Sequence, residues 1–275
     1  VVSDLWGESW KRAYGASDPG ALPNHVCTTI ALDPDSPSDR RILYAGLFGE
    51  DTEAGVYISR DSGKTWRQTA TQPGVLPNRH VYRLRIHPYS KKIYCLLTGF
   101  RGNLPNFFNH EGGGLWAPSD QGNSWEHLTA GSMLNRWATA PAFDPENENV
   151  LYVTAATPQG GTGAGGVYKS SDGGKTWLQV LKDKRMQSLS GGLPYDHTMA
   201  VAVHPGNSAL VFVGTTNHGL FFSTDAGNTW RWCKDFYFTN ANSIVFDPRD
   251  GDRIIVTTFG AGVWSASISR IVSGN

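Results

Sequence analysis

Short apolar stretches alternate with polar turns along the whole chain, without the spacing of an amphipathic helix. Each unit opens with an apolar stretch that ends at Asp-Pro or His-Pro, and a second β-rich stretch follows, as in residues 42–45 and 151–154. A third stretch starts at glycine, as in Gly55-Val56-Tyr57, and a fourth follows a tryptophan. Stretches of this length between turn residues predict four β-strands per unit. The Asp-Pro and His-Pro pairs begin at Asp33, His87, Asp144, His204 and Asp247.

One turn recurs every fifty-odd residues. Four copies follow the pattern S-x-D-x-G-x-T-W with small departures, and a worn copy at residues 3–10 has Leu5 at the aspartate position. The aspartate can accept backbone N–H groups of the turn, the glycine allows a positive φ, and the tryptophan buries a large apolar surface. We therefore expect structural roles for Asp61, Trp66, Asp120, Trp125, Asp172, Trp177, Asp225 and Trp230.

Two glycine motifs look like nucleotide-binding sites, but the residues around them do not fit such sites. Gly174-Lys175-Thr176 lacks the earlier glycine of a phosphate-binding loop, because Lys169 occupies that position. The GxGxxG pattern of residues 161–166 runs into Val167-Tyr168, which predicts a strand and not the helix that a dinucleotide site needs. Metal-ligand spacings such as HExxH are also absent. We therefore expect no cofactor and no metal.

The recurrent turn resembles the Asp-box, or BNR, repeat of a family of β-propellers. The resemblance covers nearly the whole chain, and it implies an all-β propeller with four-stranded antiparallel blades. Families with this repeat include sialidases, two-domain xyloglucanases, sortilin-type receptors and photosystem assembly factors. The end of the chain is also similar to the end of large secreted bacterial BNR-repeat proteins. In such propellers the Asp-box joins the third and fourth strands and lies on the face opposite the usual ligand site.

We expect one propeller domain over residues 1–275, with five repeats. The predicted blades are residues 24–70, 79–129, 136–181, 196–233 and 240–268. The last unit lacks an Asp-box, because Ile268 stands at the aspartate position. Residues 1–14 are expected to supply its outer strand, which would close the ring and remove exposed strand edges. The alternative is that the five units belong to a larger propeller, which would add blades or a second domain as partners.

Composition narrows the class of partner. The formal net charge is zero and charged residues make up 17% of the chain, so nothing indicates nucleic acid or an anionic membrane. No apolar run has the length of a membrane span, and membrane insertion is not expected. The chain starts at valine, which is consistent with a piece of a longer precursor. Cys27, Cys95 and Cys233 are expected to be buried free thiols.

The resemblance implies a ligand face built from the loops between blades and the loops between second and third strands. Polar and aromatic groups converging there would suit a sugar, because flat rings stack on its apolar faces and polar groups bind its hydroxyls. The alternative is that these residues only solvate the channel mouth, and that the long loop 99–113 folds over the rim. Phe236-Tyr237-Phe238 is a second aromatic candidate, for which burial between blades is favoured. The candidate ligand-binding residues are His25, Arg79, His80, Arg101, Phe107, Phe108, His110, Arg136, Trp137, His197, His218 and Asn240.

Glycoside hydrolysis usually needs two carboxylates, and the catalytic candidates are Glu50, Glu111 and Asp196. The Arg-Ile-Pro motif of sialidases is absent, and the second propeller of the xyloglucanases is missing. The leading hypothesis is a secreted or periplasmic carbohydrate-active propeller that binds a polysaccharide or oligosaccharide, with hydrolysis left open. The alternative is a non-catalytic protein-interaction or assembly scaffold.

Overall fold

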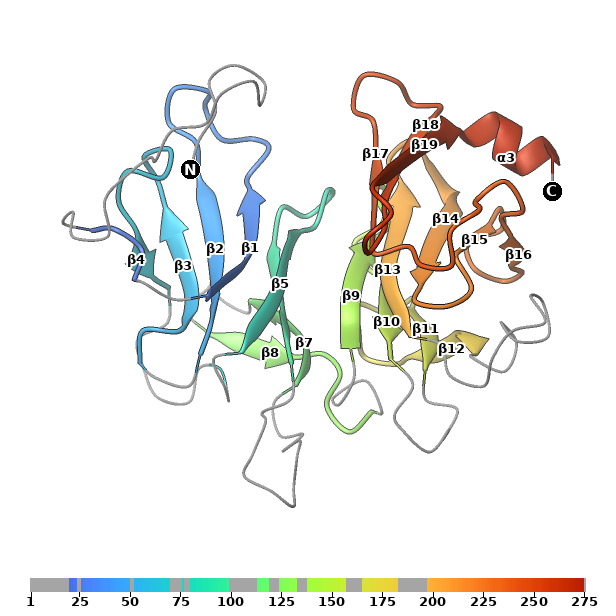
Figure 1. Cartoon of the computed structure of the whole chain (residues 1–275). Coiled ribbons are helices and arrows are strands. Elements are labelled where there is room, and N and C mark those ends of the chain that lie inside the picture. The colour runs from blue at the N-terminus through green and yellow to red at the C-terminus, as the bar shows by residue number, and fades with distance from the viewer. Residues whose placement is uncertain are drawn as a thin grey trace.

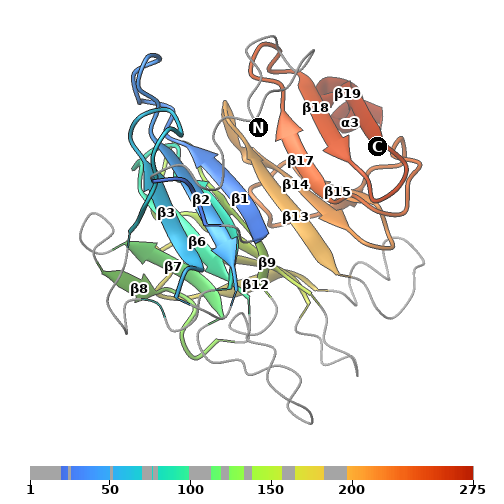
Figure 2. The same ribbon diagram turned by 60° about the vertical axis from the view of Figure 1, so that its left-hand side comes forward.

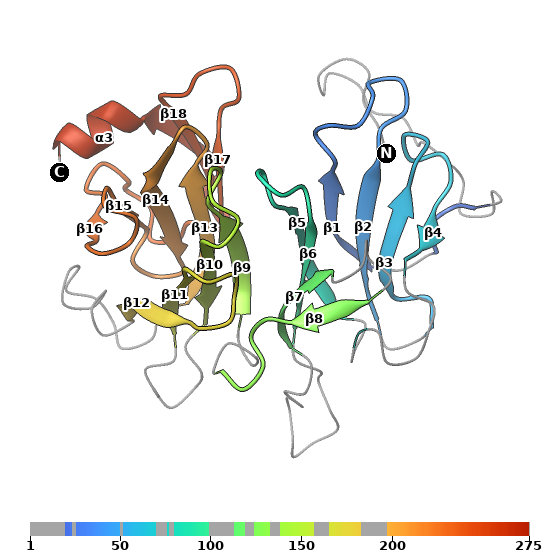
Figure 3. The same cartoon turned by 180° about the vertical axis from the view of Figure 1, so that it is seen from behind.

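The computed structural model describes residues 20–23, 26–49, 52–69, 76, 80–98, 113–118, 124–132, 138–156, 165–182 and 197–274. Five antiparallel sheets follow one another around a centre, which confirms the predicted all-β propeller (Figure 1). The first strands of the blades lie nearest the centre, and the fourth strands lie at the periphery (Figure 3).

Each blade is a simple meander, in which every strand pairs with the next along the chain. Blade 1 comprises β1 (Val26–Leu32), β2 (Leu43–Phe48), β3 (Gly55–Ser59) and β4 (Arg67–Gln68). Blade 2 comprises β5 (Val81–Ile86), β6 (Ile93–Leu97), β7 (Gly114–Pro118) and β8 (Trp125–His127). Blade 3 comprises β9 (Ala138–Phe143), β10 (Leu151–Ala155), β11 (Gly166–Ser170) and β12 (Leu178–Lys182). Blade 4 comprises β13 (Thr198–His204), β14 (Asn207–Thr215), β15 (Leu220–Ser223) and β16 (Arg231–Trp232).

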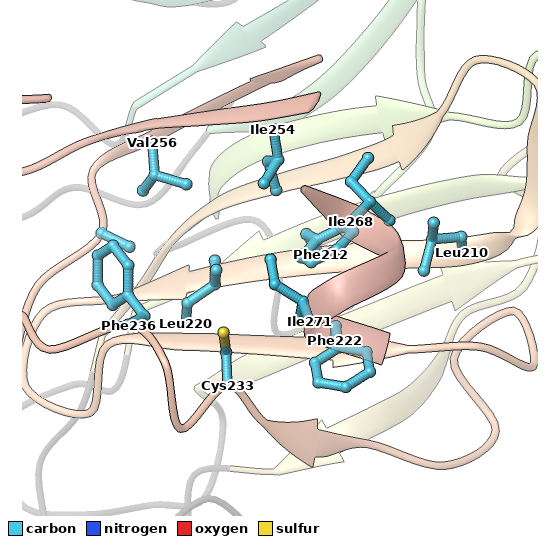
Figure 4. Packing of buried hydrophobic residues seen from close by; sticks show 11 residues of the cluster. Leu210, Phe212, Leu220, Phe222, Cys233, Phe236, Ile254, Val256, Ile268 and Ile271 are labelled. Atoms are coloured by element: carbon cyan, nitrogen blue, oxygen red, sulfur yellow. The ribbon is translucent and has the colours of Figure 1, made fainter. Parts of the chain in front are cut away.

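Blade 5 has three described strands and a helix. These are β17 (Ser243–Phe246), β18 (Arg253–Thr257), β19 (Val263–Ser267) and α3 (Ile268–Gly274). Ile268 and Ile271 of α3 are buried against Phe212 and Phe222 of blade 4 (Figure 4). The helix therefore begins where the other blades have an Asp-box, and it seals the outer part of the boundary between blades 4 and 5. The predicted completion of this blade by residues 1–14 lies outside the described residues.

The core lies between adjacent blades. The second strands of blades 2 and 3 are buried along their whole length, because each contacts a neighbouring blade on both of its faces. Leu96 and Leu115 of blade 2 meet Leu151 and Val153 of blade 3 in one cluster. Cys95 and Cys233 are buried free thiols, but the prediction for Cys27 is wrong, since its side chain is exposed. It lies on β1, where Val26, Ile30 and Leu32 are exposed as well.

Hydrogen bonds between neighbouring blades join the inner strands. Thr28 donates its hydroxyl to Val81 O across blades 1 and 2 at 2.6 Å. Arg83 Nε donates to Thr139 O across blades 2 and 3 at 2.8 Å. Thr139 in turn donates its hydroxyl to Thr198 O, in blade 4. Between blades 4 and 5, Ala241 N donates to Thr215 O at 2.8 Å. Each of the first four blades is thus bonded to the following one through a backbone carbonyl group.

The Asp-box turns are closed by side chains of their own residues. In blade 3 the Ser170 hydroxyl donates to Asp172 at 2.7 Å and accepts the Gly174 N–H at 2.8 Å. Trp177 Nε1 donates to Gly174 O and to Leu128 O of blade 2. The turn therefore folds locally, and its tryptophan anchors it to the preceding blade.

The aspartate or histidine before each proline has an equivalent local role in the first hairpin of its blade. The side chains of Asp33, Asp144 and Asp247 accept the N–H two residues ahead. In blades 2 and 4, Nδ1 of His87 and His204 replaces the carboxylate as acceptor for Tyr89 N and Gly206 N. At His87, whose pKa is lowered by burial, this acceptor role requires a neutral ring with its proton on Nε2.

Candidate functional site

The meander sends the loops of each blade to two opposite faces. The first-to-second and third-to-fourth turns share one face, as the bonds from Ser62 N to Arg41 O and from Gly173 N to Asn149 O demonstrate. All other connections therefore emerge on the opposite side, which we call the loop face. Figure 2 shows how the strands run between these two ends of the blades.

Much of the predicted site falls outside the described residues. This holds for the catalytic candidates Glu50, Glu111 and Asp196, and for Asp120 of the second Asp-box. It also holds for the ligand-binding candidates His25, Arg79, Arg101, Phe107, Phe108, His110, Arg136 and Trp137. His80, His197, His218 and Asn240 are described, and they lie at the starts of inner strands or in loops of the loop face.

His80 is a packed residue at the boundary of blades 1 and 2. Its ring stacks on Phe48 with ring centres 4.5 Å apart and 21° between the ring planes, and it is only 2% exposed. Phe48 itself is 36% exposed, so it covers the histidine and keeps one side open to solvent. A ligand on this side would meet the phenyl ring before the imidazole.

His197 and His218 belong to the same corner of blade 4. The backbone of His197 exchanges hydrogen bonds with Thr216, and His218 N donates to the Thr215 hydroxyl at 3.0 Å. His218 O accepts the Trp232 indole N–H at 3.0 Å, and the His218 side chain is buried. His197 is half-buried, whereas His218 is buried and shapes the turn.

Asn240 connects the loops of blades 4 and 5. Its side-chain oxygen accepts the backbone N–H of Phe259, which lies in the β18–β19 turn. The Thr258 hydroxyl braces that turn, since it donates to Gly262 O and accepts from Ala261 N. The two loops are therefore held together on the loop face.

These braced loops expose two aromatic rings. Tyr237 is 83% exposed and Phe259 is 81% exposed, while Phe236 is buried to 2%. The expected burial of the 236–238 segment is thus correct for Phe236 and wrong for Tyr237, because neighbours in an extended chain point to opposite sides. The sequence signal for Tyr237 was this alternation. For Phe259, the only sequence feature that indicated exposure was its position in a loop between a second and a third strand.

Inside the ring, four inner strands line a cavity of about 190 Å³. Arg83 and Arg85 of β5 form one side, and the small residues of β9 and β13, such as Ala140, Ala142 and Ala202, form another. Asn242 and Ser243 add polar groups from blade 5. The arginines were not among the predicted site residues, because strand spacing alone does not reveal that they converge on the centre.

No cluster of three or more His, Cys, Asp or Glu side chains suited to a metal ion is present within the part of the chain that the structure describes. In the same part, no helix is long and apolar enough to cross a membrane.

Comparison with known proteins gives three kinds of match. The family model Sortilin-Vps10, described as sortilin, neurotensin receptor 3, matches residues 54–191. A xyloglucanase from Paenibacillus sp is 29% identical over 89% of this chain and 25% of its own length. An oligoxyloglucan-reducing end-specific xyloglucanase from Emericella nidulans is 23% identical over 98% of this chain and 35% of its own length.

The crystal structure of an ancestral GH74 enzyme has a similar fold, with a TM-score of 0.62 and 18% identity. The match covers 90% of this chain and 34% of that enzyme. The chain thus spans no more than about a third of the length of the two xyloglucanases and of this structure.

Proposed function

This chain belongs to the Sortilin-Vps10 family of BNR-type propellers. From its xyloglucanase relatives we propose that it binds a polysaccharide outside the cytoplasm. One observation carries the proposal. Two xyloglucanases, one bacterial and one fungal, align with nearly the whole of this chain. We therefore take a β-glucan such as xyloglucan as the first candidate ligand. These relatives do not favour the alternative of a protein-interaction scaffold.

The exposed rings of the loop face support this proposal. Tyr237 and Phe259 leave most of their surface in water, and their loops are tied together through Asn240. A sugar ring presents an apolar face of C–H groups, which would cover an exposed aromatic ring. Binding would then be favoured by the apolar surface that both rings remove from water. Because the loops are already braced, little conformational entropy would be lost when a glycan binds.

Binding can be measured by calorimetry with xyloglucan oligosaccharides. We expect Tyr237→Ala and Phe259→Ala each to weaken binding about threefold to tenfold, the equivalent of one aromatic contact. Tyr89→Ala is a matched control, because Tyr89 is 60% exposed in a hairpin turn on the Asp-box side. The proposal fails if the intact protein binds no β-glucan, or if all three variants bind like the parent.

Hydrolysis is a separate part of the proposal. It would require two carboxylates on the loop face, with Glu50, Glu111 and Asp196 as the candidates. Glu50→Gln, Glu111→Gln and Asp196→Asn should each be assayed for release of reducing ends from xyloglucan. A catalytic role predicts loss of turnover with retained glycan binding. If the parent binds xyloglucan without cleaving it, the chain acts as a binding module.

A further inference from the structure

The cavity at the centre of the propeller has two chemically different walls. Ala140, Ala142, Ala200 and Ala202 present methyl groups from β9 and β13, and Arg83 and Arg85 present guanidinium groups from β5. The two arginines are the sole charged residues among the described residues that line it. The cavity therefore combines a cationic side with an apolar side in about 190 Å³.

Each arginine is held by the backbone, and most of its donors have no acceptor among the described residues. Arg83 Nε donates to Thr139 O at 2.8 Å, and Arg85 Nη1 donates to Leu84 O at 2.9 Å. A guanidinium has five N–H donors, so these bonds orient the groups without saturating them. Within the described part of the chain, no carboxylate pairs with either arginine. The ring of Tyr82 lies beside Arg83, with its centre 5.1 Å from Cζ.

Two cations in one cavity, with no carboxylate partner among the described residues, are electrostatically unfavourable. Desolvation by the surrounding residues, and then the charge of Arg83, lower the pKa of Arg85, although the Arg85 side chain keeps part of its surface exposed to solvent. Arginine nevertheless stays protonated at neutral pH, so both charges persist. A bound anion would relieve the mutual repulsion, and the apolar wall would strengthen the attraction by lowering the local dielectric constant.

We propose that this central cavity binds a small organic carboxylate, with its oxygens on Arg83 and Arg85 and its carbon skeleton against the alanine wall. The planar fork of a guanidinium matches the two oxygens of a carboxylate. The methyl groups favour a ligand with an apolar body over a bare inorganic anion. The size of the cavity suits a small molecule, so this site is distinct from a polysaccharide site on the loop face and does not depend on it.

Calorimetry at low salt with benzoate and benzamide tests this proposal, since the two probes differ mainly in charge. We expect benzoate to bind, benzamide to bind at least tenfold more weakly, and inorganic phosphate to bind more weakly than benzoate. Equal binding of benzoate and benzamide, tighter binding of phosphate, or no binding of benzoate would each overturn it.

Variants separate binding from folding. Arg85→Met should weaken benzoate binding about tenfold and disturb the fold little, because among the described residues Arg85 bonds only to the carbonyl of its neighbour. Arg83→Lys retains a charge but loses the fork, and we expect a smaller reduction. Arg253→Met is the matched control, because Arg253 pairs with Asp250 away from the cavity. Unchanged benzoate affinity in an Arg85→Met protein with a native circular dichroism spectrum would contradict the proposal.

Discussion

The carboxylate of Asp172 binds Thr176 twice. Its Oδ1 accepts the backbone N–H of Thr176 at 2.9 Å, and its Oδ2 accepts the hydroxyl of the same residue at 2.6 Å. Asp61 with Thr65, and Asp225 with Thr229, repeat this arrangement. The bonds span only four residues, so each turn can form before distant parts of the chain meet.

Removal of this carboxylate should destabilise the propeller. We expect Asp172→Ala to lower the melting temperature, because the backbone N–H and the hydroxyl of Thr176 would lose their acceptor. The Ser170 hydroxyl, which accepts the Gly174 N–H, would also lose the carboxylate that orients it. Asp172→Asn should lower it less, since one acceptor oxygen remains. Differential scanning calorimetry is the measurement, with Asp39→Ala at an exposed turn as the control. A melting temperature that falls equally in the Asp172→Ala and Asp39→Ala variants would contradict this role.

Stability should also fall in strong acid. The hydroxyl and backbone N–H of Thr176, followed by Ser170, lower the pKa of Asp172 from 3.8 to about 2. Partial burial opposes the same effect at Asp61 and Asp225, but their hydrogen bonds outweigh it and the pKa is again about 2. The unfolded chain binds protons first as the pH falls, so this stabilisation is complete above pH 3.8 and is lost down to about pH 2. Urea titrations across this range should show the decline in parental protein and a smaller decline in an Asp172→Asn variant.

Protonation of His87 should cause a second, smaller loss of folding stability as the pH falls. It is fully buried, and burial lowers its pKa below the usual 6.5. Because Nδ1 accepts N–H bonds from Tyr89 and Ser90, protonation would break the turn. Its contribution to stability is therefore present above pH 6.5 and is lost as the pH falls through its folded pKa. Nitrogen NMR shifts should identify the Nε2–H tautomer at neutral pH, and a protonated Nδ1 in the folded state would refute this assignment.

Substitution of Gly166 should destabilise the protein. It has a φ of +129°, and a Cβ at this position would collide with the carbonyl oxygen of Leu181 in the paired strand. We expect Gly166→Ala to cost about 1–3 kcal/mol in the free energy of unfolding, measured with urea. Gly251→Ala is the control, because Gly251 has open space around it and no positive φ. Equal losses in both variants would mean that backbone strain at Gly166 is unimportant.

The architecture could be predicted because its information is local and repeated. The Asp-box closes on itself through Ser170, Asp172 and Thr176, and the strand pattern is the same in each unit. The structure adds that the residue before the Asp-box glycine also has a positive φ, as at Ser62 and Ala226. This conformation could not be predicted from the sequence, because non-glycine residues seldom adopt a positive φ.

The candidate site was less predictable, because it depends on contacts between blades. The burial of His80 under Phe48, and of His218 in its turn, comes from strands that are distant in sequence or from a specific turn geometry. The exposure of Tyr237 depends on which side of its loop meets blade 5. Arg83 and Arg85 look like ordinary polar positions of a strand until the ring brings them to its centre.

The blade-to-blade bonds through Thr28, Arg83, Thr139 and Thr215 also have a mechanical consequence. Each of these bonds joins two consecutive blades, and none of them reaches a more distant blade. A force applied across the molecule would therefore act on one blade boundary at a time. Repeat proteins with such nearest-neighbour coupling yield unit by unit. Stretched in an optical trap, this propeller should therefore lengthen in successive steps of one blade, and the weakest boundary should open first.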